Sequence, residues 1–189
     1  ENCFSVNQPQ YGNMKLFWAP MLQKKQLAAK HPIVKNLGYV IFLQGGTVDA
    51  SEAQANKNLK TTILAKSSEK SWVQSKDIQL YPNMQAPIDR SIEKSENLAV
   101  LIEGKFPSAF DKSPTKQENN ETGISANTHI SQGTQNGKLF VVNTSFITSN
   151  QLIDPECSEP VAMFVRNAID YMNGNEDLCT MRTKGLVLN

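Results

Sequence analysis

The feature that most constrains the fold of this chain is a run of five apolar residues, Leu98 to Ile102, which Glu103 and Gly104 follow. Side chains on a β-strand alternate between the two faces of a sheet, so a strand that is apolar at every position must be covered on both faces. The run is far shorter than the roughly 20 apolar residues of a membrane-spanning helix. We therefore predict a central strand over residues 98–104 of a sheet with structure on both sides.

Other segments are short, apolar and bounded by glycine, proline or polar residues, which is typical of strands. The strands predicted on this basis cover residues 38–43, 61–65 and 138–142, with a last short strand at 178–181. Residues 14–18 form a weaker strand candidate, which Pro20 is expected to end. Residues 22–30 are predicted to form one or two helical turns.

The strongest helical pattern follows Cys157. Ser158 is a favourable N-cap, and Glu159 and Pro160 suit the first turn. Apolar side chains then recur at three- and four-residue spacing, and Gly174 is placed to close the helix as its C′ residue. The apolar positions are Val161, Phe164, Val165, Ala168, Ile169 and Met172. Strands interspersed with helices predict an α/β layer structure in a single domain over residues 1–189.

Residues 111–137 differ in composition from the rest of the chain. They are rich in Ser, Thr, Asn, Gln, Lys and Gly, and Ile124 and Ile130 are the only sizeable aliphatic side chains there. Burial of so few apolar groups does not offset the entropy lost on ordering the backbone. We predict a long mobile loop over these residues.

Charge and composition exclude several functional classes. The formal net charge is +1, and the basic residues are scattered, so no general electrostatic attraction to nucleic acid or to anionic membrane is expected. The sequence has neither a signal peptide nor an apolar stretch long enough to span a bilayer. Because it begins with Glu1 rather than Met, we expect it to be part of a longer protein whose membrane anchor lies outside this sequence.

The three cysteines, Cys3, Cys157 and Cys179, do not have the spacing of a metal site. No C-x-x-C pair is present, and the two histidines, His31 and His129, are isolated in the sequence, so we predict neither a metal nor a cofactor. The sequence allows a disulfide between Cys157 and Cys179, but three structural thiols are the favoured interpretation.

An enzyme is the first alternative to a binding protein. Cys157 lies just before the predicted helix, where a helix N-terminus can lower the pKa of a thiol. Its candidate bases are His31 and His129, and the alternative is a hydrolase or an amidotransferase-like enzyme with Cys157 as nucleophile. The chain lacks a G-x-S-x-G elbow and a complete phosphate-binding glycine motif, so a structural thiol is favoured and no catalytic residue is predicted.

A carbohydrate- or peptide-binding module is the second alternative. It would use Trp18, Trp72 and Tyr81 as an exposed aromatic row. Packing of these side chains in the core is the favoured interpretation.

The C-terminal part of the sequence resembles a known family. Residues 138–146 read Lys-Leu-Phe-Val-Val-Asn-Thr-Ser-Phe, residues 163–178 contain Asn-Ala-Ile-Asp-Tyr-Met-Asn-Gly-Asn-Glu-Asp-Leu, and residues 181–184 read Met-Arg-Thr-Lys. This order resembles the GldG-like auxiliary components of ABC-type transport systems linked to gliding motility. The matching positions are Asn167, Ala168, Asp170, Gly174, Glu176, Asp177, Leu178, Arg182 and Lys184. Asn143-Thr144-Ser145 departs from the family's acidic turn, and Tyr171-Met172 replaces the usual Trp-Leu.

The resemblance implies a fold, a location and partners. The fold would be a layered sheet with flanking helices, similar to flavodoxin and to class I glutamine amidotransferases but without a catalytic triad. The domain would be non-catalytic, would lie on the periplasmic face of the inner membrane, and would be anchored by helices outside this sequence. Its partners would be the permease and ATPase subunits of the transporter, or related envelope proteins.

The matching residues suggest structural roles. We hypothesise that the amide of Asn167 and the carboxylate of Asp170 tie the predicted helix to a neighbouring loop. Arg182 and Lys184 would form ion pairs with Glu176 or Asp177, or would face lipid headgroups.

Overall fold

The computed structural model describes residues 3–82, 87–112 and 129–184 of the chain. The described strands form two antiparallel sheets of three strands each. The first sheet contains β1 (Cys3–Gln8), β2 (Gly12–Gln23) and β3 (Tyr39–Ile41), and the second contains β4 (Leu59–Lys66), β5 (Asn97–Gly104) and β6 (Gly137–Val142). The α-helices are α1 (Ser51–Ala55), α2 (Pro160–Met172) and α3 (Glu176–Lys184), and the 3-10 turns are η1 (Lys24–Gln26), η2 (Arg90–Ile92) and η3 (Ser145–Thr148).

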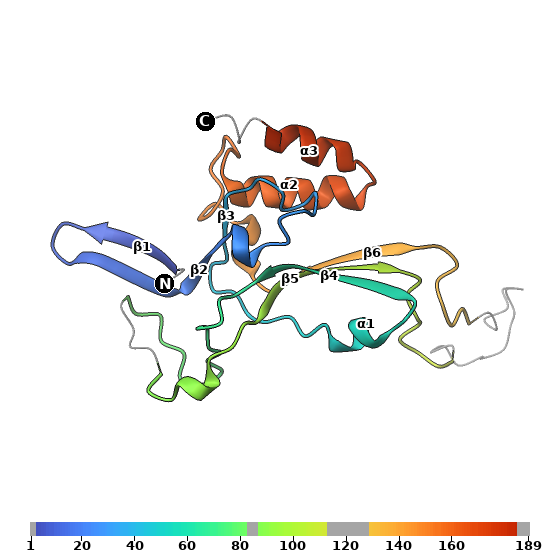
Figure 1. The fold of residues 1–189 in the computed structure, drawn as a ribbon, viewed down its shortest axis with the longest axis horizontal. Coiled ribbons are helices and arrows are strands. Elements are labelled where there is room, and N and C mark those ends of the chain that lie inside the picture. The colour runs from blue at the N-terminus through green and yellow to red at the C-terminus, as the bar shows by residue number, and fades with distance from the viewer. Residues whose placement is uncertain (1–2, 83–86, 113–128, 185–189) are drawn as a thin grey trace, which may run out of the picture.

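The predicted central strand is β5, and it is covered on both faces. Ala99 and Leu101 face the larger core beneath α2, whereas Val100 and Ile102 face a smaller core. In Figure 1, α2 and α3 lie on one side of the β4–β5–β6 sheet and α1 lies on the other. The apolar run of β5 is therefore satisfied by two layers of cover.

The predicted flavodoxin-like or amidotransferase-like sheet is wrong. Those folds are built on parallel strands joined by helical crossovers, whereas β4, β5 and β6 pair antiparallel in sequence order. Burial on both faces is most common in parallel sheets. Here an antiparallel sheet has the same burial because α1 and the segment before it cover the face that such sheets often leave in water.

The other strands of the second sheet were also predicted correctly. The segments at 61–65 and 138–142 are the central parts of β4 and β6, and the segment at 38–43 contains the short strand β3. The predicted loop at 111–137 lies mostly outside the described residues. In its described part, Gln132 forms an isolated bridge with Pro107, and β6 begins at Gly137.

Pro20 does not end its strand, contrary to the prediction. β2 continues to Gln23, and Pro20 lies opposite Cys3 at an irregularity in the β1–β2 register. At such an irregularity the missing N–H of proline costs little pairing. The carbonyl of Pro20 accepts a hydrogen bond from the Phe42 amide at 3.0 Å.

The predicted helix is α2, with small differences at its start. Its N-cap is Glu159 rather than Ser158, with Pro160 in the first turn, and Gly174 follows its end with φ of +82°. A left-handed backbone angle at this position is what a glycine C′ residue supplies.

The predicted strand at 178–181 is wrong, because these residues belong to α3. Glu176 and Asp177 lie in the first turn of α3, and Arg182 and Lys184 lie in the last, so the charges complement the helix dipole at both ends. Within the described ranges, no helix is both long and apolar enough to cross a membrane.

Phe164 provides a test of the packing beneath α2. Its side chain is fully buried and lies edge-on to the rings of Phe42 and Phe140, with centroids 6.0 and 5.6 Å away. We expect Phe164→Ala to lower the free energy of unfolding by about 3–5 kcal/mol, because it leaves a cavity between β3, β6 and α2. Denaturant unfolding measures this change. Ile169→Ala, on the exposed face of the same helix, should change it by much less.

Candidate functional site

Three of the residues matched to the family lie together where α2 meets α3. The guanidinium of Arg182 donates to the side-chain oxygen of Asn167 and to the carboxylate of Asp170, with which it forms an ion pair. The amide of Asn167 donates to the carbonyl of Ile33 at 3.1 Å. We call Asn167, Asp170 and Arg182 the α2–α3 tie.

The tie holds three segments of the chain together. Asn167 is completely buried, and the side chains of Asp170 and Arg182 are only 21% and 18% exposed. The Cys179 thiol reinforces this junction by donating to the carbonyl of Asn167 at 3.3 Å. Burial raises the pKa of the Cys179 thiol, and the nearby carboxylate of Asp170 adds to this, so the thiol stays protonated.

The remaining residues of the motif do not join the tie. Gly174 closes α2, Glu176 lines a groove described below, and Asp177 and Lys184 are exposed. The ion pair of Arg182 goes to Asp170 rather than to Glu176 or Asp177.

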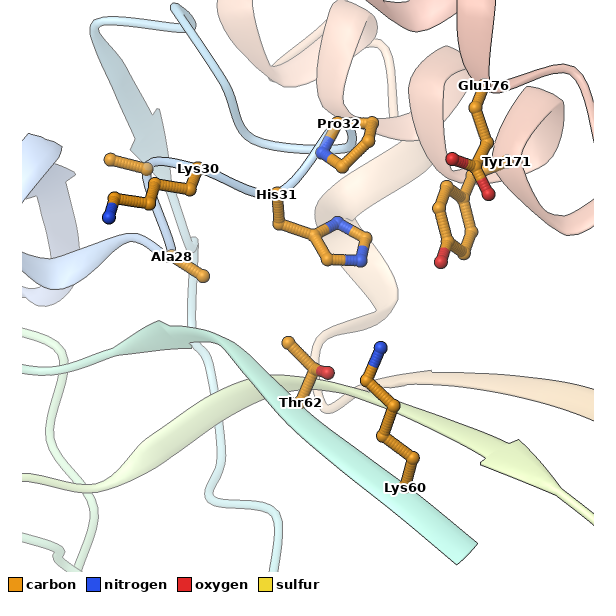
Figure 2. A pocket seen from close by; sticks show the side chains of 9 residues that line it. Ala28, Lys30, His31, Pro32, Lys60, Thr62, Tyr171 and Glu176 are labelled. Atoms are coloured by element: carbon orange, nitrogen blue, oxygen red, sulfur yellow. The ribbon is translucent and has the colours of Figure 1, made fainter.

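A groove opens beside the tie, at the edge of the second sheet. Its volume is about 520 Å³, and four segments of the chain contribute to its walls. We call it the His31 groove, and Figure 2 shows the His31 ring and the Lys60 ammonium group pointing toward one another across it. It is lined by Ala28, Ala29, Lys30, His31, Pro32, Lys60, Thr62, Tyr171 and Glu176.

The orientation of His31 is fixed by two contacts. Its ring lies 4.8 Å from that of Tyr171, and its Nδ1 accepts a hydrogen bond from the amide of Ile33 at 3.3 Å. In the neutral ring, Nδ1 as acceptor places the proton on Nε2. The groove is therefore supplied with an N–H donor on a rigid ring.

Tyr171 connects the groove to the sheet. Its hydroxyl donates to Glu103 at 3.0 Å, and its carbonyl accepts from the Lys138 ammonium group at 2.7 Å. The same ammonium group lies 4.2 Å from the centroid of the Tyr171 ring, within the range of a cation–π contact. Lys60 of β4 lies 3.9 Å from Glu103, so it is only loosely paired.

These contacts set the protonation states in the groove. Burial lowers the pKa of His31, and the charges of Glu103 and Glu176 oppose those of Lys60 and Lys138 in smaller effects. The imidazole is therefore held neutral at physiological pH. Burial and the hydrogen bond to Glu103 raise the pKa of Tyr171 to about 12, so its hydroxyl stays a donor.

The structure does not bring Cys157 together with His31. Cys157 precedes α2, whereas His31 contacts the last turn of that helix, and a helix of 13 residues is about 20 Å long. The Cys157 thiol donates to the carbonyl of Asp154, and the ring of His129 bonds to the hydroxyl of Ser108. Cys157 and Cys179 are both free thiols.

The three aromatic residues of the second alternative do not form a row of exposed rings, since Trp18 and Trp72 are both half-buried. Trp72 is half-buried, and its ring lies 5.7 Å from that of Phe17. Phe17 and Trp18 are consecutive on β2 and point to opposite faces, which separates Trp18 from Trp72. Tyr81 is 60% exposed.

Sequence reasoning missed most of the groove. It treated His31 only as a base for Cys157 and Tyr171 only as a departure from a family pattern. A charged residue at the end of a buried strand was a usable signal, because Glu103 follows Ile102 directly and must reach a partner or water. The contact between Lys138 and Tyr171 joins residues 33 positions apart, and neither the strand pattern around Lys138 nor the helix pattern around Tyr171 indicates it.

The α2–α3 tie predicts a specific loss of stability. Asn167→Leu leaves the carbonyl of Ile33 and one contact of Arg182 without a partner, and an unsatisfied buried polar group costs about 1–3 kcal/mol. Denaturant unfolding should show this loss. Arg166→Leu, at the preceding exposed position of α2, is the matched control. An equal loss in both variants would contradict the tie.

His31 predicts a pH dependence of stability. Its folded pKa lies below the unfolded value of 6.5, so the unfolded chain binds the proton more readily in this range. The contribution of His31 to the free energy of unfolding should therefore be complete above about pH 7.5 and should fall as the pH drops through 6.5 toward the folded pKa. Unfolding of the wild type and of His31→Phe across this range isolates it. A difference between the two proteins that does not change with pH would refute the prediction.

Comparison with known protein families finds a match that covers most of the chain. A sequence model of the family described as "ABC-type uncharacterized transport system" matches residues 3–180. No curated protein and no solved structure matches the chain. The resemblance to an ABC transport component is thereby confirmed at the level of this family, whereas the gliding-motility class stays a prediction. Because the match covers far more than half of the sequence, the chain belongs to the ABC-type uncharacterized transport system family.

Proposed function

We propose that this chain is the extracytoplasmic domain of an auxiliary component of an ABC-type transporter and that it acts by binding. Membership of the transport family supports the context. The His31 groove carries the proposal for binding, because it combines a fixed N–H donor on His31, a Tyr171 hydroxyl held by Glu103 and a position at the edge of the sheet. The ATPase and the permease are separate chains in this proposal.

The chemistry of the groove favours binding over catalysis. The imidazole of His31 has one nitrogen occupied by the backbone of Ile33, and the hydroxyl of Tyr171 is committed to Glu103. A pKa near 12 makes Tyr171 a poor nucleophile or base at neutral pH. Among the residues lining the groove, the only other hydroxyl is that of Thr62, and the groove has no thiol. These groups can orient a ligand without exchanging protons with it.

The narrower assignment rests on the resemblance alone. The matching residues from Asn167 to Lys184 favour the gliding-motility class of auxiliary component, with a periplasmic location and an anchor outside this sequence. The α2–α3 tie gives three of these residues a structural reason to occur together.

Recovery of transporter subunits tests the proposal. We expect the membrane-anchored protein, purified from its native membranes in mild detergent, to carry an ABC ATPase and a permease that mass spectrometry identifies. A matched form that lacks residues 3–184 but keeps the rest of the protein should lose both subunits. Protein synthesis and membrane insertion of the two forms are compared on the same blots.

Two results would contradict the proposal. Recovery of no transporter subunit with the intact protein would remove the transport role, and equal recovery without residues 3–184 would remove the binding role of this domain. Normal surface gliding of cells that lack residues 3–184 would refute the narrower gliding-motility assignment alone.

A further inference from the structure

The second sheet contains the beginning of a fourth strand. Leu27 forms an isolated antiparallel bridge with Ala65, and the amide of Ala28 donates to the carbonyl of Leu64 at 2.9 Å. The chain then turns away, because the amide of Ala29 bonds back to Leu27 and that of His31 bonds back to Ala28. The outer edge of β4 is thus paired at its C-terminal end only.

Toward its N-terminal end the amide of Leu59 bonds back to the carbonyl of Asn56 at 3.1 Å, and between Leu59 and Leu64 the edge faces no neighbouring strand among the described residues. The carbonyl of Asn58 accepts a hydrogen bond from the amide of Lys105 at 3.3 Å, which fixes the alternation of bonds between β4 and β5. By that alternation Lys60 and Thr62 bond to β5, whereas the amide and carbonyl of Thr61 face outward. The order of strands places β4 at the edge of the sheet.

The His31 groove lies where the interrupted strand would continue. Ala28 to Pro32 form one of its walls, and the side chains of Lys60 and Thr62 on β4 form another. Figure 2 shows β4 passing along the groove with both side chains directed into it. A strand that continued from Ala28 along β4 would occupy this space.

We propose that an extended acidic peptide segment of a partner protein binds here, as an antiparallel strand added to the outer edge of β4. Its backbone pairs with Thr61 and continues the pairing that Leu27 and Ala28 begin, and one of its carboxylates faces Lys60. Strand addition of this kind takes its affinity from main-chain bonds and its specificity from alternate side chains. The inference rests on the proposed binding function and names its surface and its ligand class.

The charges in the groove favour an acidic side chain. The side chain of Lys60 is 76% exposed, and its ion pair with Glu103 is as long as 3.9 Å. The Nε2–H of His31 is a second donor on the same face, and Lys30 adds a second positive charge among the lining residues. Glu176 is the one carboxylate among them, and it lies on α3 beyond Tyr171. A carboxylate near Lys60 and His31 would therefore meet two donors.

Selection of peptides tests the proposal directly. A display library of random peptides is selected on the 189-residue chain, and the recovered peptides are synthesised. We expect them to contain an acidic residue and to slow hydrogen exchange of the Thr61 amide, measured by NMR. N-methylation of the peptide backbone at alternate residues should abolish binding, because it removes the donors that pair with β4.

Charge reversal at Lys60 tests whether this residue recognises the acidic side chain of the peptide. Lys60→Glu should weaken the recovered peptides about tenfold, and changing their acidic residue to lysine should restore affinity, since opposite charges across strands attract and like charges repel. Lys66→Glu, at the end of β4 beyond the Ala65 bridge, is the matched control and should have little effect. Circular dichroism and denaturant unfolding establish that both variants are folded.

Three outcomes would overturn the proposal. The first is the recovery of no binding peptide. The second is slowed hydrogen exchange at the β6 edge, or at an interface between two copies of the chain, instead of at the Thr61 amide. The third is equal weakening of peptide binding by Lys60→Glu and Lys66→Glu. The membrane-anchored Lys60→Glu protein separates this proposal from the broader one. If it recovers the ATPase and permease as well as the wild type does, the β4 surface does not bind them, while the transport role stands.

Discussion

The absence of a water-facing side on β5 governs the arrangement of the other elements. Val100 and Leu101 are completely buried on opposite faces, so neither face of this strand can be left to solvent. The chain covers one face with α2, β3 and the segment after η1, and it covers the other with α1 and the residues before it. The short helix α1 would have little reason to dock without Val100 and Ile102, because five residues are too few for a stable isolated helix.

Polar contacts determine how α2 is placed on this core. Apolar packing of Phe164 against Phe42 and Phe140 supplies the attraction that holds α2 against the sheet. The bond from Asn167 to the carbonyl of Ile33 and the bond from Lys138 to the carbonyl of Tyr171 each join two separate segments at one point. Both contacts lie in the C-terminal half of α2, and together they fix that half of the helix and with it one wall of the His31 groove.

Elements of the fold could be predicted from the sequence where their signal lies in consecutive residues. The apolar run of β5 and the 3.6-residue periodicity of α2 are carried by consecutive residues, and both elements were predicted within one or two residues of their ends. The direction of pairing is not carried by any single strand, and the flavodoxin-like parallel sheet that the family resemblance implied is wrong.

The candidate site shows the same division between local and distant signals. Asn167, Asp170 and Arg182 were noted because a family pattern includes them, but the pairing of Arg182 with Asp170 depends on the angle between α2 and α3. Residues 178–181 were predicted as a strand but belong to α3. The charges at both ends of α3 were visible in the sequence and favoured a helix.

The protection of β4 against unwanted pairing is uneven along its length. Proteins commonly guard edge strands with bulges, lysines and covering segments. Two of these guards, the irregular register between Ile63 and Lys66 and the bridge to Leu27, are concentrated at the C-terminal end of the strand. Toward the N-terminal end Lys60 guards the edge, and a lysine repels basic strands while attracting an acidic one. An edge guarded in this way stays closed to self-aggregation and open to a partner of opposite charge, which is the property that a docking edge requires.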